Sequence, residues 1–109
     1  MISRIWHGWT AHRNADAYEN LLKSEILPGI QAKGIRGYRG IQLYRRELAA
    51  ETEFMTVMWF DSLRAVKAFA GADYDVAVVP PKARELLARH DRRSAHYEIR
   101  ESLVPFQPA

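Results

Sequence analysis

The sequence predicts a small α+β domain whose sheet is covered by helices on one face and by a second copy of the protein on the other. The first observation is the segment 53–60, which reads as a strand with apolar side chains on both faces. The second is the length, because 109 residues supply enough helix to cover one face of a sheet and hardly enough for two. We therefore expect a homodimer that pairs through its sheet faces.

The first strand and the first helix follow from the opening residues. Residues 2–11 are rich in β-branched and aromatic side chains, which favour a strand. Asn14 or Asp16 can cap a helix. Apolar side chains then recur at helical spacing, namely Tyr18, Leu21, Leu22, Ile26 and Leu27. Pro28 is expected to end or kink this helix, because proline has no amide hydrogen to donate, and the last turn can resume through Ile30 to Ala32.

Two more strands and a second helix occupy the middle of the chain. Residues 36–46 form the second predicted strand, in which two glycines indicate a bulge. A polar connector, long for a tight hairpin, leads to the third strand at 53–60. Asp61 or Ser62 then caps a helix, and Gly71 lies where its C-terminal cap is expected.

The last third adds a helix and a strand. Pro81 can start a helix that continues through Lys82–His90, and residues 95–101 alternate as a strand with one polar side. The order β-α-β-β-α-β, with one extra helix, is the ferredoxin-like plan. It predicts the sheet order 4-1-3-2, with both main helices on one face. We expect one domain over residues 1–101 and a C-terminal arm or tail at 102–109.

The composition limits the function classes. The net charge is only +3 and is spread along the chain, so we expect no nucleic-acid partner. The absence of cysteine excludes disulfides, thiolate metal sites and cysteine nucleophiles. No apolar run approaches the roughly 20 residues that span a bilayer, and the N-terminus does not resemble a signal peptide. We therefore expect a cytoplasmic protein without membrane contact.

Two histidines are the candidate catalytic residues. His7 and His96 lie in the first and fourth predicted strands, which should be neighbours, and a partly buried imidazole titrates near neutrality. Each is equally open to a structural role, hydrogen-bonded or on the dimer face. His12 and His90 fall at the ends of elements and are expected at the surface. Because no metal-binding spacing of His or paired carboxylates occurs, we expect no metal site.

Aromatic side chains are the candidate substrate-binding residues. Core packing and dimer contact would explain most of them. A cavity between the sheet and the helices would nevertheless be lined by such side chains, and flat walls suit a flat substrate or a porphyrin. The candidates for these walls are Trp6, Phe60 and Tyr74.

Three segments resemble the antibiotic biosynthesis monooxygenase domain family. They are Ile-Ser-Arg-Ile-Trp-His-Gly at residues 2–8, Trp-Phe-Asp-Ser-Leu-Arg-Ala-Val-Lys-Ala-Phe-Ala-Gly at 59–71 and His-Tyr-Glu-Ile at 96–99. The similarity covers about residues 1–101. It implies a dimeric α/β barrel of ferredoxin-like topology, with a pocket between sheet and helices in each subunit. Members include cofactor-independent oxygenases of aromatic polyketides or quinols and haem-degrading enzymes, and many have no established activity.

The resemblance also bears on single positions. The family often places a Trp directly before an acidic residue and Ser, and here Phe60 holds that place before Asp61. In the haem-degrading branch, a strand-one Asn and a His beyond the second helix complete the site. Trp6 and about Val79 occupy those places here. Strand alternation favours Trp6 facing the helices and His7 facing the partner subunit.

The leading hypothesis is a cofactor-independent monooxygenase or oxidase of small aromatic, polyketide-like or quinol-like substrates. Trp6, Phe60 and Tyr74 would help to wall its pocket, and His7 or His96 would be nearest to a base role. One alternative is a non-catalytic dimeric barrel that binds a small hydrophobic ligand or acts in stress response. Another is a haem-binding or haem-degrading protein with His7 or His90 as axial ligand.

Overall fold

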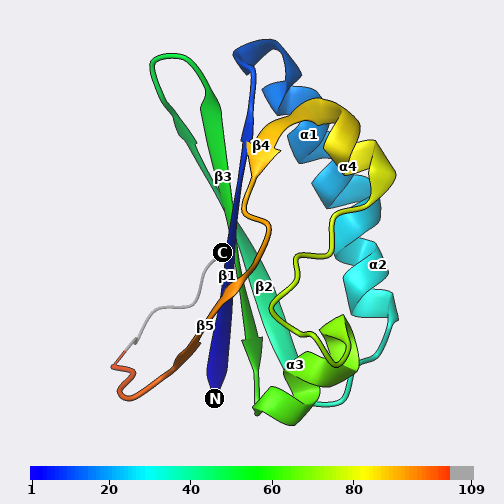
Figure 1. The fold of residues 1–109 in the computed structure, drawn as a ribbon, viewed down its shortest axis with the longest axis vertical. Helices are drawn as coiled ribbons and strands as arrows, with labels where there is room; N and C mark the ends of the chain where they lie inside the picture. Colours follow the sequence, from blue (N-terminus) through cyan, green and yellow to red (C-terminus); the bar gives the residue numbers. More distant parts are fainter. Residues whose placement is uncertain (104–109) are drawn as a thin grey trace.

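Helices cover one face of a five-stranded antiparallel sheet in the computed structural model, which describes residues 1–103 (Figure 1). The strands are β1 (Ile2–Thr10), β2 (Tyr38–Glu47), β3 (Thr52–Phe60), β4 (Leu87–His90) and β5 (Ala95–Glu98). The helices are α1 (Ala15–Leu21), α2 (Leu27–Ala32), α3 (Leu63–Ala70) and α4 (Pro81–Leu86). The predicted tail, 102–109, lies for the most part outside the described residues.

The sheet has the predicted ferredoxin-like order. β3 pairs with β1 on one side and with β2 on the other, and both β4 and β5 pair with the free edge of β1. β5 runs beside Ile2–Ile5, and β4 runs beside Gly8–Thr10. The expected fourth strand is thus divided into two pieces along one neighbour. The order 4-1-3-2 is confirmed.

The prediction of a helix over Lys82–His90 is wrong in its second half. The helix ends at Leu86, and Leu87–His90 instead form β4 against β1. Local apolar spacing favours a helix here, but the ladder to β1 supplies partners for the backbone that local spacing cannot reveal. The last strand is also shorter than expected and ends at Glu98.

One other boundary agrees with the predictions and one differs. The first helix passes Pro28 and continues to Ala32, as the expected resumption predicts, after a π-helical segment at Leu22–Ile26. A π-turn is wider than an α-turn. The helix can therefore pass Pro28 even though proline has no amide hydrogen to donate to the preceding turn. The connector between β2 and β3 is a tight hairpin, since pairing extends to Glu47 and Thr52.

The predicted helix signals around α3 are confirmed. The Ser62 hydroxyl accepts a hydrogen bond from the amide of Ala65 at 3.3 Å, and Gly71 closes the helix with φ of +93°. A positive φ of this size favours glycine because it has no side chain to clash. The predicted bulge is also present, between Tyr38 and Gly40 in β2.

The core lies between the sheet and the helices in two adjoining clusters. One surrounds Phe60 and Val66 beneath α3, and the other surrounds Tyr18 and Phe54 beneath α1 and α4. The opposite face of the sheet carries no helix among residues 1–103 (Figure 1). Its apolar side chains include Ile5, Met55, Val57 and Trp59. The prediction that both faces of β3 are apolar therefore corresponds to a core face and an open apolar face.

Candidate functional site

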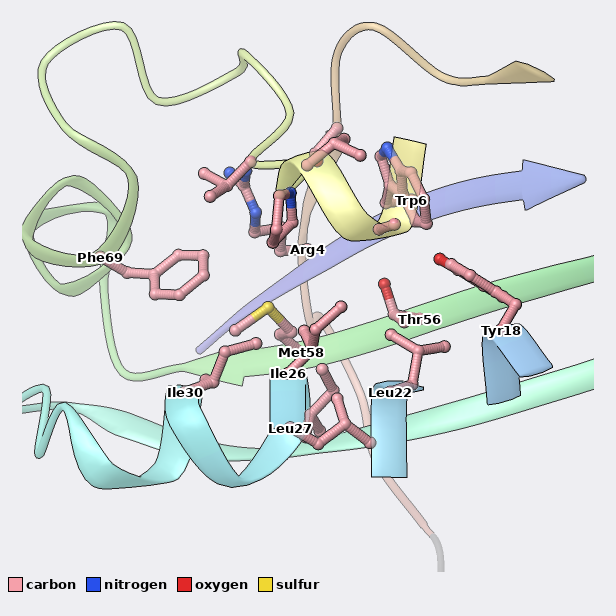
Figure 2. A pocket seen from close by; sticks show the side chains of 16 residues that line it. Arg4, Trp6, Tyr18, Leu22, Ile26, Leu27, Ile30, Thr56, Met58 and Phe69 are labelled. Atoms are coloured by element: carbon pink, nitrogen blue, oxygen red, sulfur yellow. The ribbon is translucent and has the colours of Figure 1, made fainter. Parts of the chain in front are cut away.

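A cavity of about 70 Å³ lies between the sheet and the helices, and it adjoins a groove of about 620 Å³ on the outer surface. The two spaces share the lining residues Ile26, Ile30, Phe69, Val78 and Pro80. Most of the other cavity walls are apolar side chains of the helices and of β3. In Figure 2 the labelled side chains converge on this space from strands β1 and β3 and from the helical segments that follow β1.

Trp6 forms the roof of the cavity at its inner end (Figure 2). Its indole Nε1 donates a hydrogen bond of 2.9 Å to the carbonyl oxygen of Asp91, which holds the ring in one orientation. The close approach of Gly8 leaves room for the ring, because a Cβ at that glycine would lie 2.8 Å from Trp6 Cη2. The expectation that Trp6 faces the helices agrees with this geometry.

Two hydroxyl groups point into the space beneath Trp6. Tyr18 reaches it from α1 and Thr56 from β3 (Figure 2). Tyr18 is only 1% exposed, and burial raises the pKa of its phenol well above the ordinary value, so the hydroxyl stays protonated. Neither hydroxyl hydrogen-bonds to another group within residues 1–103, which leaves both free to bind a ligand.

Arg4 brings a positive charge to the inner end of the cavity. The residue is only 4% exposed, and its Nη atoms donate to the carbonyl oxygens of Tyr74 and Val76 at 2.5 and 3.3 Å. Nη1 also lies 3.0 Å from Nε2 of His96. All of these partners are neutral acceptors. Burial lowers the pKa of Arg4, and the charge of Asp75 partly opposes that effect. A guanidinium still remains charged at neutral pH.

His96 lies behind Arg4, away from the cavity lining. Its side chain is 9% exposed, and its ring meets that of Tyr74 edge to face at 5.1 Å between centroids. Burial and the neighbouring charge of Arg4 lower the pKa of His96 below its usual value, with Asp75 acting in the opposite sense. The imidazole is therefore neutral at neutral pH.

The other predicted site residues lie apart from the cavity. His7 is on the open face of the sheet, where its Nδ1 lies 2.8 Å from Oδ2 of Asp91 and its side chain is 33% exposed. Phe60 is fully buried in the core beneath α3. Tyr74 packs beside the same cluster and supplies a backbone carbonyl to Arg4 rather than a cavity wall. The geometry thus brings His96 and Tyr74 together around Arg4 and leaves His7 on the other side.

Arg4, Tyr18 and Thr56 are the polar groups that sequence reasoning missed. Apolar spacing places Tyr18 on the buried face of its helix, but that spacing does not show where the phenol hydroxyl points. Arg4 carries a usable signal, since it falls on the same alternate positions of the first strand as Trp6. A charge on a core-facing position indicates either a partner or a ligand.

The outer groove is bordered by charged side chains. Lys33 Nζ lies 5.0 Å from the centre of the Phe69 ring, and Lys82 pairs with Glu25 at 3.1 Å. All four residues line the groove. Its floor is apolar and its rim is charged, as expected of an entrance that admits a flat, largely apolar molecule.

Neither a metal centre nor a membrane span is found among residues 1–103. No three of the His, Asp and Glu side chains there are grouped as metal ligands. None of the described helices has both the length and the hydropathy needed to cross a bilayer. Trp6 and Val79, which stand at the haem-branch positions, both line the cavity, and neither side chain can ligate iron.

Solved structures of similar fold match almost the whole chain. A proposed antibiotic biosynthesis monooxygenase from Bacillus cereus has a TM-score of 0.68 at 12% identity, covering 98% of each chain. SnoaB, a cofactor-independent oxygenase from Streptomyces nogalater, has a TM-score of 0.59 at 14% identity, over 94% of this chain and 96% of that one. A monooxygenase from the gene ActVA-Orf6 of Streptomyces coelicolor, in complex with the ligand nanaomycin D, has a TM-score of 0.58 at 12% identity, over 96% and 92%.

Sequence comparison adds no further relative. No family model matches the chain, and no curated protein matches it. The structural similarity, however, confirms the resemblance of the three sequence segments at the level of the fold. The chain has the ferredoxin-like α+β fold of antibiotic biosynthesis monooxygenases.

Proposed function

We propose that this protein is a cofactor-independent monooxygenase or oxidase of small aromatic substrates of the phenol, quinol or anthrone type. One observation carries the proposal: a buried guanidinium, whose hydrogen bonds within residues 1–103 all go to neutral acceptors, lies at the inner end of a largely apolar cavity. Such a charge stabilises an anion that forms beside it, because little water is present to screen the attraction. The fold shared with a cofactor-independent oxygenase adds support.

The size of the cavity decides how a substrate would bind. A volume of about 70 Å³ is well below the roughly 300 Å³ at which ligand pockets begin. A ring system must therefore extend into the groove, past the shared wall of Ile30, Phe69 and Val78. The oxygen-bearing end would lie beneath Trp6, next to Arg4 and the Tyr18 hydroxyl.

In this reaction the protein needs only to bind the substrate and to stabilise its anion, because the anion itself reduces dioxygen. Once deprotonated, an electron-rich arene passes one electron to dioxygen, and the resulting radical pair combines to a peroxide. In an anthrone, one oxygen atom becomes the new carbonyl, and the other leaves as water with the two hydrogens of the methylene carbon. In a quinol, two electrons and two protons pass to dioxygen, which gives the quinone and hydrogen peroxide.

Named residues would serve these steps. Arg4 stabilises the substrate anion, and Tyr18 donates a hydrogen bond to oxygen because its phenol stays protonated. Trp6, Met58 and Leu22 keep water from the substrate oxygen beside Arg4, while the methylene carbon lies toward the groove. Neither His7 nor His96 faces the cavity, so we assign the substrate proton to water in the groove rather than to a histidine.

The test is oxygen uptake on a panel of anthrones and quinols, with metal and flavin removed by chelation and gel filtration. We expect turnover in the wild type, one atom of labelled oxygen per anthrone product, and a loss of at least tenfold in Arg4→Gln, since removing one oxyanion donor typically costs 10²–10³-fold. Arg39→Gln, which removes an exposed ion pair with Asp61, is the matched control. Arg4→Lys keeps the charge and guards against a folding defect.

The non-catalytic alternative rests on a specific observation, namely that no histidine or carboxylate of residues 1–103 lines the inner cavity. Binding of anthrones to the wild type without any oxygen uptake across the panel would favour that alternative. It would also remove the support for an oxygenase.

We also propose that two copies pair through the open sheet face. Ile5, Met55 and Trp59 are half-buried on that face, and Val57 is buried there. A contiguous apolar surface of this kind is typical of an interface. Light scattering at low micromolar concentration should give twice the chain mass, and Met55→Lys should give the single mass. A folded wild-type monomer would contradict the proposal.

A further inference from the structure

We propose that His96 is a positioning residue, which holds the guanidinium of Arg4 toward an aromatic oxyanion in the cavity. This inference rests on the proposed function, since the anion is the substrate of that site. It adds a second residue and a proton-dependent step to the role of Arg4. His96 lies between Arg4 and Asp75 and contacts both.

The contact between Arg4 and His96 determines the tautomer of the imidazole. Arginine has only hydrogen-bond donors, so at 3.0 Å from Nη1 the Nε2 atom of His96 must act as the acceptor. A neutral imidazole with an accepting Nε2 carries its proton on Nδ1. His96 is thus held in one protonation state by its neighbour, with no free nitrogen for a base role.

Asp75 lies on the other side of the ring. Nδ1 of His96 is 3.2 Å from Oδ1 of Asp75, close enough for attraction but without the alignment of a hydrogen bond. The position of Asp75 is defined by the backbone, because the Ser94 amide donates to its carbonyl oxygen at 2.7 Å. The loop that carries Asp75 is therefore tied to the chain just before β5.

The same loop supplies the other partners of Arg4. Tyr74 and Val76 give it their carbonyl oxygens, and an isolated bridge joins Val76 to Arg93. Lys67 of α3 lies 5.6 Å from the centre of the Tyr74 ring, so it is the further charge facing this region from the helices. Arg4 is thus held by Tyr74, Val76 and His96, and on the cavity side its guanidinium carbon lies 5.6 Å from the centre of the Phe69 ring, so a ligand would bind beside that ring.

Protonation of His96 would undo this arrangement. The ring would then have a donor at both nitrogens, and two cations would lie 3.0 Å apart. Arg4 would lose an acceptor and move from its place beside the cavity. We therefore expect anion binding to weaken toward acid pH, with a midpoint below the ordinary histidine value of 6.5.

A coloured phenol tests this without any turnover. The probe is 4-nitrophenol, whose anion absorbs visible light and whose neutral form does not. Bound beside Arg4, its phenol should ionise at lower pH than in water, because an opposite charge favours the anion. The absorbance at fixed pH, titrated with protein, gives both the affinity and the shift.

Three variants separate positioning from structure. His96→Gln offers an amide oxygen to Arg4 and cannot titrate, so affinity near neutrality should stay within about threefold and the acid limb should flatten. His96→Met offers no strong acceptor and should weaken anion binding about tenfold, the factor expected for one charge-assisted hydrogen bond. His12→Gln changes an exposed histidine and should match the wild type.

Ring-nitrogen NMR of the wild type completes the test. We expect His96 as the Nδ1–H tautomer, with a pKa below 6.5. An Nε2–H tautomer, or an acid limb that persists in His96→Gln after the ionisation of the probe itself is subtracted, would overturn the inference. If the probe binds and shifts as expected while no aromatic substrate consumes oxygen, the positioning role stands and the oxygenase proposal fails. If the probe fails to bind while substrates turn over, the positioning role fails alone.

Discussion

Substitution of Gly8 by alanine should disturb the cavity through Trp6. An alanine Cβ would lie 2.8 Å from Trp6 Cη2 and 2.9 Å from Cδ2 of Leu87, both below ordinary van der Waals contact. The leucine can turn away, but the indole is tied to Asp91 by its hydrogen bond of 2.9 Å. The ring must withdraw by about 0.6 Å or more to restore contact, and that shift stretches the bond.

The expected cost follows from three contributions. Overpacking a filled site costs about 1–3 kcal/mol, and the weakened hydrogen bond costs about 1 kcal/mol. Replacing glycine within a strand returns about 0.5–1 kcal/mol, because alanine loses less backbone entropy on folding. We therefore expect Gly8→Ala to lower the free energy of unfolding by about 1–3 kcal/mol. It should also weaken ligand binding, since the displaced indole forms the roof of the cavity.

Urea unfolding followed by far-ultraviolet circular dichroism measures the first effect, and titration with 4-nitrophenol measures the second. Gly29→Ala is the matched control for stability, because nothing in the described chain beyond its neighbours and the backbone of its own helix lies within 4 Å of a Cβ at that position. It should raise the free energy of unfolding by up to about 1 kcal/mol, the helix preference of alanine over glycine. A Gly8→Ala protein within 0.5 kcal/mol of the wild type, with unchanged affinity, would refute the account of how Trp6 is held.

Three further outcomes are expected. Ser62→Ala should lower the free energy of unfolding by about 1 kcal/mol in urea, because the α3 cap is lost, and no change would mean that water replaces the cap. Tyr18→Phe should slow oxygen uptake without loss of stability. Tyr38→Phe is the control, because the buried Tyr38 hydroxyl lacks a partner among the described residues and lies outside the cavity, so uptake should be unchanged. Equal rates of uptake in the two variants would exclude a role for the Tyr18 hydroxyl. Folding lowers the pKa of His96, so below pH 6.5 the unfolded chain binds more protons than the folded one. The free energy of unfolding should therefore fall as the pH is lowered from 6.5, and more steeply in the wild type than in His96→Gln. Parallel curves for the two proteins would argue against a buried neutral imidazole.

The fold was predictable where the signal is local. Alternation along the third strand, the Ser62 cap and Gly71 each concern a few neighbouring residues, and the structure has all three. The end of α4 was not predictable, because Leu87–His90 become a strand only through pairing with β1, some 80 residues earlier in the chain. Local spacing contains no information about that partner.

The site was less accessible to sequence reasoning than the fold. Trp6 follows from strand alternation, since its parity places it with the buried side chains of β1. Tyr18 and Thr56 meet beneath it only because α1 crosses β3 at that point. His96 was expected to act on a substrate itself, yet its proximity to Arg4 reflects the pairing of β5 with the start of β1. Such juxtapositions depend on the register between distant strands.

The division of the fourth strand has a consequence for aggregation. A long, regular outer strand offers unsatisfied amides and carbonyls to any foreign chain that can align beside it. Here that boundary is interrupted between His90 and Ala95, and neither piece exceeds four residues. The opposite boundary carries Arg39, Arg45 and Arg46, each in an ion pair with a carboxylate, and charged side chains of this kind disfavour pairing with a foreign strand. A foreign chain therefore finds no template at either edge of the sheet. Association between copies is directed to the open face of the sheet instead.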